Sequence, residues 1–113
     1  MSVHINSKTY PAEYLSKSED IQRGMMGRDT LNGCMVFKMG LGHHSFWMKN
    51  CLIKLDIVFV QNKRITHIYL NCPVEDSHRM NPPHYNGIGD HVIEFPGGTA
   101  NEWKIGDKVF IGE

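Results

Sequence analysis

Four charged residues and one tryptophan could together form a binding site: Arg28, Lys49, Asp56, Glu94 and Trp47. Asp56 and Glu94 each interrupt an otherwise apolar segment, and a buried carboxylate needs a partner. Arg28 would bind a carboxylate or phosphate through two parallel hydrogen bonds, and Lys49 would act as a point charge. If all five converge, we expect a pocket for a small polar or anionic molecule, in which Trp47 supplies apolar contact. The alternative is two structural ion pairs.

A second set of candidates combines sulfur and imidazole side chains, which together suit Cu(I). Its members are Met25, Met26, Met35, Met39, Met48, Cys34, Cys51, His43 and His44. No pair has a zinc spacing such as Cys-x-x-Cys, and methionine at strand or helix spacing usually fills a core. We therefore expect neither a metal site nor a cofactor.

Two further kinds of chemistry are considered and not favoured. A cysteine could act as a nucleophile with a histidine as base, and Cys72 is the best candidate because it opens a segment that also contains His78 and His84. No nucleophile motif surrounds it, and free cysteine is commonly a small buried hydrophobe. The amides of 97–99 could bind a phosphate, but the Gly-Lys-Ser/Thr ending of a P-loop is missing.

Length and composition predict one ordinary globular domain over residues 1–113. The hydrophobic share of 41% is enough for a core, and the formal net charge is zero. A neutral chain has no bulk electrostatic grip on nucleic acid or anionic membrane, so we expect neither as a partner. The three cysteines form no disulfide framework. With no secretory signal or long apolar run in the sequence, we expect a cytoplasmic location.

Short strands must position the candidate residues. Segment 55–61 is apolar on both faces except for Asp56, which predicts a strand at the centre of a sheet or in a covered barrel wall. Its two faces are Leu55/Ile57/Phe59 and Asp56/Val58/Val60. It should form a hairpin with 64–70. The other expected strands are 3–5, 9–15, 33–39, 45–49, 91–96 and 108–111, with a break at 40–42.

Two short helices and one long loop complete the expected architecture. The first helix should begin at a capping box formed by Ser16 and Glu19, with Ser18 as an alternative cap, end near Met26 and stop at Gly27. The second should run from 99 to 103. Residues 71–90 are rich in proline, glycine and asparagine, which predicts a loop of about twenty residues that could gate a pocket.

Several of these segments together resemble the family known as domain of unknown function 192. Residues 24–28 resemble its G-L-M-G-R turn, and 46–60 its F-W-M-K-N-T-L-I-P-L-D-I-L-F-I signature. Residues 92–98 resemble V-L-E-L-P-A-G, and 105–107 its closing I-x-V-G-D. Cys51 stands where the family usually has threonine, and Lys54 where it usually has proline. The resemblance implies a compact, mostly β domain and supplies no activity.

We therefore expect a single α+β domain, dominated by a small antiparallel barrel or strongly curved sheet with two short helices. The leading functional hypothesis is a non-enzymatic binding module that uses the five residues above, gated by loop 71–90. A second is a small enzyme with Lys49 or Asp56 as acid or base. A third is a protein-interaction module that binds a partner through loop 71–90 and a sheet edge.

Overall fold

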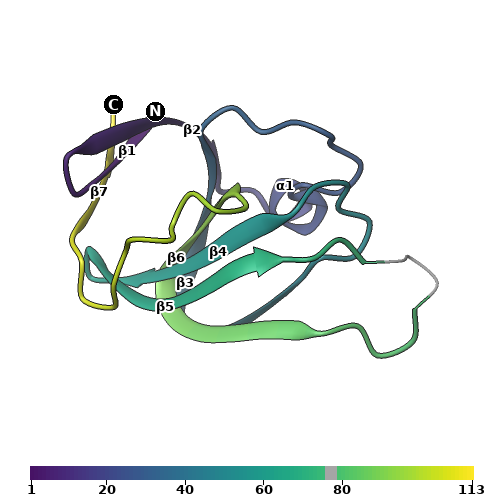
Figure 1. The fold of residues 1–113 in the computed structure, drawn as a ribbon. Coiled ribbons are helices and arrows are strands. Elements are labelled where there is room, and N and C mark those ends of the chain that lie inside the picture. Colours follow the sequence, from purple (N-terminus) through teal and green to yellow (C-terminus); the bar gives the residue numbers. More distant parts are fainter. Residues whose placement is uncertain (76–78) are drawn as a thin grey trace.

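Seven strands form one curled sheet in the computed structural model of the protein, which describes residues 1–75 and 79–113 (Figure 1). The strands are β1 (Ser2–Ile5), β2 (Lys8–Leu15), β3 (Cys34–Trp47), β4 (Leu55–Gln61), β5 (Arg64–Cys72), β6 (His84–Pro96) and β7 (Val109–Gly112), and the helix in the described part is α1 (Ser18–Arg23). Their order across the sheet is β5-β4-β6-β3-β2-β1-β7. The expected mostly β single domain is confirmed.

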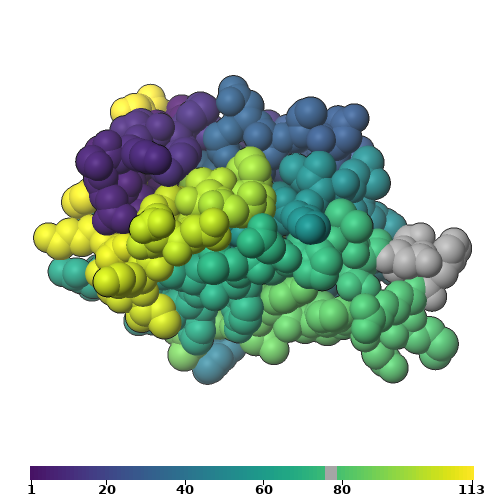
Figure 2. All heavy atoms as spheres, viewed as in Figure 1, coloured from purple at the N-terminus to yellow at the C-terminus, as the bar shows by residue number. Residues whose placement is uncertain are grey.

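The sheet curls because its two ends approach each other. The amide of Ile65 in β5 donates to the carbonyl of Asp107 at 2.9 Å, and the amide of Val109 in β7 donates to Lys63 at 2.9 Å. β1 lies antiparallel between β2 and β7. Both termini therefore lie at one end of the molecule, where the N-terminal hairpin packs beside the C-terminal segment (Figure 2). The result is a half-barrel.

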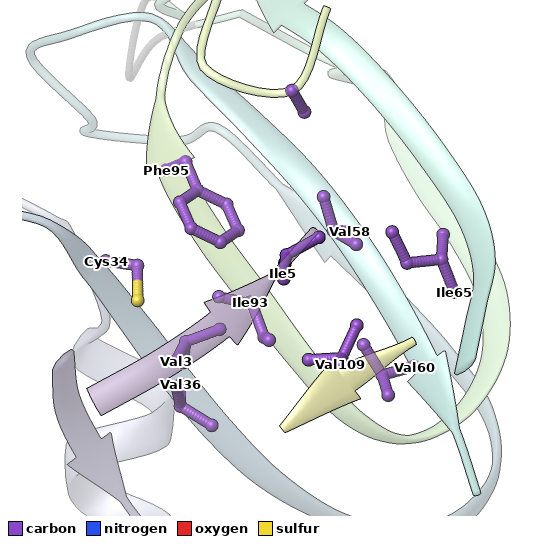
Figure 3. Packing of buried hydrophobic residues seen from close by; sticks show 11 residues of the cluster. Val3, Ile5, Cys34, Val36, Val58, Val60, Ile65, Ile93, Phe95 and Val109 are labelled. Atoms are coloured by element: carbon purple, nitrogen blue, oxygen red, sulfur yellow. The ribbon is translucent and has the colours of Figure 1, made fainter. Parts of the chain in front are cut away.

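Apolar side chains cover both faces of β4, as its sequence predicts. Val58 and Val60 belong to a first core, and Ile57 and Phe59 belong to a second core on the opposite face. The first core fills the inside of the curl and consists of Val3, Ile5, Cys34, Val36, Val58, Val60, Ile65, Ile93, Phe95, Ala100 and Val109 (Figure 3). The second core consists of Met25, Met35, Phe37, Met48, Cys51, Leu55, Ile57, Phe59, Cys72 and Val92.

The predicted break at 40–42 is wrong. β3 continues through these residues, and its pairing with β6 shifts register between Lys38 and Gly42. A register shift of this kind absorbs extra residues without ending a strand. The predicted strand at 45–49 is therefore the second half of β3, which ends at Trp47.

The predicted loop 71–90 is too long at both ends. β5 extends to Cys72, and β6 begins at His84, because residues 84–89 pair with the second half of β3. Gly87 lies inside β6. The position needs a glycine because a Cβ atom there would lie 2.7 Å from the ring of Phe59. This glycine permits close packing and does not mark a turn. Residues 76–78, including the candidate His78, lie outside the described residues.

The helix predictions are partly wrong. Residues 97–102 form turns in place of the predicted helix 99–103, and the Thr99 hydroxyl donates to the carbonyl of Pro96 at 2.7 Å. α1 is confirmed as a helix, but its N-cap is Lys17 and no side chain caps it, so the expected capping box does not form. α1 also ends earlier than expected, because Gly24 adopts a φ of 47° directly after Arg23.

Gly33 should be far less replaceable than other glycines of the chain. Its φ is +78°, and a Cβ atom there would lie 2.0 Å from the carbonyl oxygen of Pro11, where β3 starts beside β2. Gly27 has nearly the same φ, +76°, with nothing within 4 Å of a Cβ atom. We expect Gly27→Ala to lower the free energy of unfolding by about 1–2 kcal/mol. Gly33→Ala should cost at least about 2 kcal/mol more.

Urea unfolding followed by circular dichroism measures both variants. Equal losses for the two alanines would contradict the close approach of the backbone at Gly33.

Candidate functional site

Asp56 and Glu94 lie on opposite faces of the sheet. Glu94 in β6 pairs with Ile57 in β4 and with Met35 in β3, and both neighbours belong to the second core. Side chains of directly paired residues share a face, whereas consecutive residues alternate. Asp56 therefore faces the other way, and no single pocket holds both carboxyl groups.

Asp56 is a fully buried acceptor for three backbone amides. Its Oδ1 accepts from Asn71 at 2.8 Å and from Gly98 at 3.1 Å, and its Oδ2 accepts from Ala100 at 2.8 Å. These bonds join β4 to the end of β5 and to the turn after β6. Hydrogen bonds of this kind to a carboxylate are stronger than neutral ones. They give Asp56 a structural role at the centre of the fold.

Arg28 forms its ion pair with a residue outside the predicted set. Its two terminal nitrogens donate to both oxygens of Glu13 in β2, at 2.5 and 2.7 Å. The guanidinium beside Glu13 holds the pKa of that carboxyl below its usual value. Both side chains are substantially exposed, so the pair contributes little to stability.

Lys49 and Trp47 lie together, although β3 ends at Trp47 and Lys49 lies beyond it. The Nζ of Lys49 lies 5.1 Å from the centroid of the Trp47 ring, within the range of a cation–π contact. The same ring lies against His84 in β6, with 5.6 Å between ring centroids. Trp47 keeps 42% of its surface exposed.

A hollow of about 450 Å³, here called the α1–β3 hollow, brings together two of the five candidates, Trp47 and Glu94. The residues that line it are Ile21, Gln22, Arg23, Gly24, Met25, Met26, Phe37, Met39, Ser45, Phe46, Trp47, Cys51 and Glu94. Arg28, Lys49 and Asp56 are not among them. The predicted constellation is therefore divided among three places.

Glu94 is an unusual residue in this hollow because its carboxyl is buried with one oxygen unpartnered among the described residues. It is 3% exposed, and its Oε1 has no hydrogen-bond partner in the part of the chain that the structure describes. Burial raises the pKa of this carboxyl to about 8. At neutral pH the group therefore carries a proton, and it can both donate and accept a hydrogen bond.

The cysteines lack the properties of nucleophiles. All three are buried, and burial raises the pKa of Cys34 and Cys51 to about 12 and that of Cys72 to about 11. A reactive cysteine needs a lowered pKa and some exposure. Across residues 1–75 and 79–113, no three His, Cys, Asp or Glu side chains are grouped as metal ligands.

Sequence reasoning missed two features of the surface. One is the contribution of α1, whose Ile21, Gln22 and Arg23 line the hollow although nothing in their types signals a site. The other is a second hollow of about 390 Å³ beside β6.

In this second hollow, Asp90 accepts from the amide of Asn62 at 2.8 Å and contacts His91 Nδ1 at 2.7 Å. His91 Nε2 lies 3.5 Å from the hydroxyl of Tyr14. The contact between Asp90 and His91 could have been expected from the sequence, because the two residues are adjacent. The contact with Tyr14 could not, because 77 positions separate it from His91.

The fold and sequence together place the chain in a family. It belongs to the DUF192 family, described as "Uncharacterized ACR", whose model matches residues 1–111. Among curated proteins, no sequence matches it significantly. Within the described residues, no helix has the length and apolar character to cross a membrane.

Two crystal structures of other proteins are similar to the structure of this chain. A protein of unknown function from Novosphingobium aromaticivorans is 28% identical, with a TM-score of 0.86, over 97% of this chain and 84% of that chain. A putative transcription regulator from Sinorhizobium meliloti is 20% identical, with a TM-score of 0.85, over 96% of this chain and 91% of that chain. The second likeness shows the fold alone.

Asp56→Asn should destabilise the protein by about 2–4 kcal/mol. An amide group offers one acceptor oxygen, so its nitrogen would face one of the three backbone amides that the carboxylate now accepts from. Asp29→Asn, at an exposed position, is the matched control and should change the free energy of unfolding by less than about 0.5 kcal/mol. Similar values for both variants in urea unfolding would contradict the structural role of Asp56.

Stability should depend on pH through Glu94. Its pKa is raised from 4.5 to about 8, so between these values the folded protein keeps a proton that the unfolded chain releases. The free energy of unfolding therefore falls as pH rises through this window, by up to about 1.4 kcal/mol per unit from this group.

Glu94→Gln should remove that slope, whereas the exposed control Glu19→Gln should keep it. Urea unfolding at a series of pH values measures the difference from the native protein, which cancels the titration of the histidines. Parallel pH curves for the native protein and Glu94→Gln would contradict the raised pKa.

Proposed function

We propose that this protein is a binding module that takes a small molecule in the α1–β3 hollow. The observation that carries the proposal is the buried carboxyl of Glu94, which lines the hollow with one oxygen unpartnered in the described structure. A buried polar atom without a hydrogen bond is costly. A ligand that supplies the missing bond removes this cost. The volume of about 450 Å³ is in the ordinary range for small-molecule sites.

The walls of the hollow favour a ligand with a mostly apolar body. Aromatic rings come from Phe37, Phe46 and Trp47 in β3, and thioethers come from the methionines that follow α1. Methionine side chains adapt their shape to a ligand more easily than branched residues. A few polar groups in an apolar pocket are the usual arrangement for orienting a small molecule.

An anionic group on the ligand would meet a different cation from those first expected. Arg28 is paired with Glu13, and Lys49 lies over Trp47. The cation that lines the hollow is Arg23, an exposed residue at the end of α1. Any contact with an anionic group would therefore fall to Arg23 at the rim.

The enzyme and the protein-interaction module each have less support than the small-molecule binding module. For an enzyme, Asp56 would have to give up three backbone amides, and Lys49 does not line the hollow. For an interaction module, β5 is an edge strand, and Leu70 and Val74 are about half exposed at its end. The hollow with its unpartnered carboxyl favours a small ligand over a protein partner.

Thermal unfolding against a panel of small amphipathic molecules tests the proposal. A ligand at about one hundred times its dissociation constant adds roughly 2.7 kcal/mol, which raises the melting temperature of a domain this size by several degrees. Ser45 lines the hollow and is exposed, so Ser45→Trp should fill the space and abolish the shift.

Ser7→Trp, at an exposed turn between β1 and β2, is the control and should keep the shift. The proposal fails if no compound stabilises the native protein. It also fails if Ser45→Trp responds to the same compound as strongly as Ser7→Trp does.

A further inference from the structure

Building on the proposed function, we infer that the ligand of the α1–β3 hollow is a small organic ammonium ion with an apolar body, whose nitrogen forms an ion pair with Glu94. The inference names the chemical class of the ligand. Its basis is a buried acidic group with one oxygen unpartnered among the described residues, in a hollow whose lining cation, Arg23, is exposed at the rim and forms no ion pair with Glu94.

No cation of the described chain compensates Glu94. Its two neighbours across the strands, Met35 and Ile57, are fully buried and apolar. Lys49 and Arg28 are engaged elsewhere. The hollow therefore presents an acidic group, aromatic and thioether walls, and space for a ligand. A cationic nitrogen completes this set better than a neutral donor, because hydrogen bonds between charged groups are stronger.

The aromatic wall also suits an ammonium group. Trp47 lines the hollow and already holds one ammonium ion, the Nζ of Lys49, at 5.1 Å from its ring centroid. Phe37 and Phe46 line the same hollow, with 5.1 Å between their two ring centroids and the ring planes nearly perpendicular. Aromatic faces attract organic cations more strongly when water is excluded.

Binding of an ammonium ion would release the proton of the Glu94 carboxyl group. In the free protein Glu94 is protonated at neutral pH, since burial raises its pKa to about 8. When R-NH3+ enters, the carboxyl proton goes to solvent, and the ion pair of R-NH3+ with the carboxylate remains. Charge balances on both sides of this step.

The two thiols near Glu94 keep their protons during this step. On the same face are the thiols of Cys51 and Cys72, whose pKa values are raised to about 12 and about 11, so both remain protonated. Arg23 from α1 is a permanent cation at the exposed rim. Asp56 faces the other side of the sheet. His84 contacts Trp47 and Ser45 of the hollow, and imidazoles commonly titrate between about pH 5 and 8. The part of the pH dependence that Glu94→Gln removes is therefore the part that belongs to Glu94.

Isothermal titration calorimetry with matched probes tests the inference. The probes are benzylamine, phenethylamine and isoamylamine, each paired with the alcohol of the same skeleton. Between about pH 5 and about pH 7 the affinity for the amines should rise by close to tenfold per pH unit and then level off near the pKa of Glu94. Titration in buffers of different ionisation enthalpy should show about one proton released per amine bound.

Glu94→Gln keeps the shape of the side chain and removes its titration. We expect it to weaken amine binding at pH 7.5 by about tenfold or more, to abolish the rise of about tenfold per pH unit and to leave alcohol binding within about threefold. Amine binding should be lost in Ser45→Trp and kept in Ser7→Trp. These variants show that the nitrogen binds at Glu94 inside the hollow.

The outcomes separate the inference from the proposed function. If the alcohols bind as tightly as the amines, or if Glu94→Gln leaves amine binding unchanged, the ammonium class is wrong and the binding module stands. If neutral compounds of the wider panel bind in the hollow and no amine does, the result is the same. If no compound binds there at all, both proposals fall.

Discussion

The carboxylate of Asp56 is the interaction on which the rest of the structure depends. It accepts from three amides that belong to two different segments, at Asn71 and in the turn at Gly98 and Ala100. That turn carries Ala100 into the first core and leads to Trp103, which packs against Phe95. Hydrogen bonds to this buried carboxylate thus hold the segment as a turn, where the sequence predicted a regular helix. The turn can then cover the inside of the curl without a side-chain partner for Asp56.

The two cores explain why the candidate residues separate. β4 is an interior strand with a core on each side, so each residue of its neighbour β6 points into one core or the other. Asp56 and Glu94 point to opposite faces, so their side chains have different surroundings. Asp56 meets backbone amides at a place where strands end. Glu94 meets apolar neighbours in the middle of the sheet, where the amides are occupied by the ladder hydrogen bonds.

Local pattern was enough for some features and insufficient for others. The alternation along 55–61 correctly gave a strand buried on both faces, because that property depends only on side-chain period. The facing of Glu94 required the register with Ile57, which no local pattern contains. The partner of Arg28 was missed because Glu13 lies 15 positions earlier in β2, and only the path of the connection from β2 to its parallel neighbour β3 brings the two side chains together. Gly87 resembled a turn residue, since composition does not distinguish a glycine that makes room for Phe59 from one that bends the chain.

The pairing of β1 with β7 has a consequence for how the chain acquires its structure. Ser2 lies opposite Gly112, so the first and last strands are partners. Contacts of such long sequence separation form late and slow folding, since the intervening chain must be ordered first. During synthesis the free edge of β1 stays open until the last strand has left the ribosome, and Val3 and Ile5 lack the cover of Val109. The half-barrel therefore closes only after β7 has emerged from the ribosome, and the nascent chain carries an exposed apolar edge until then.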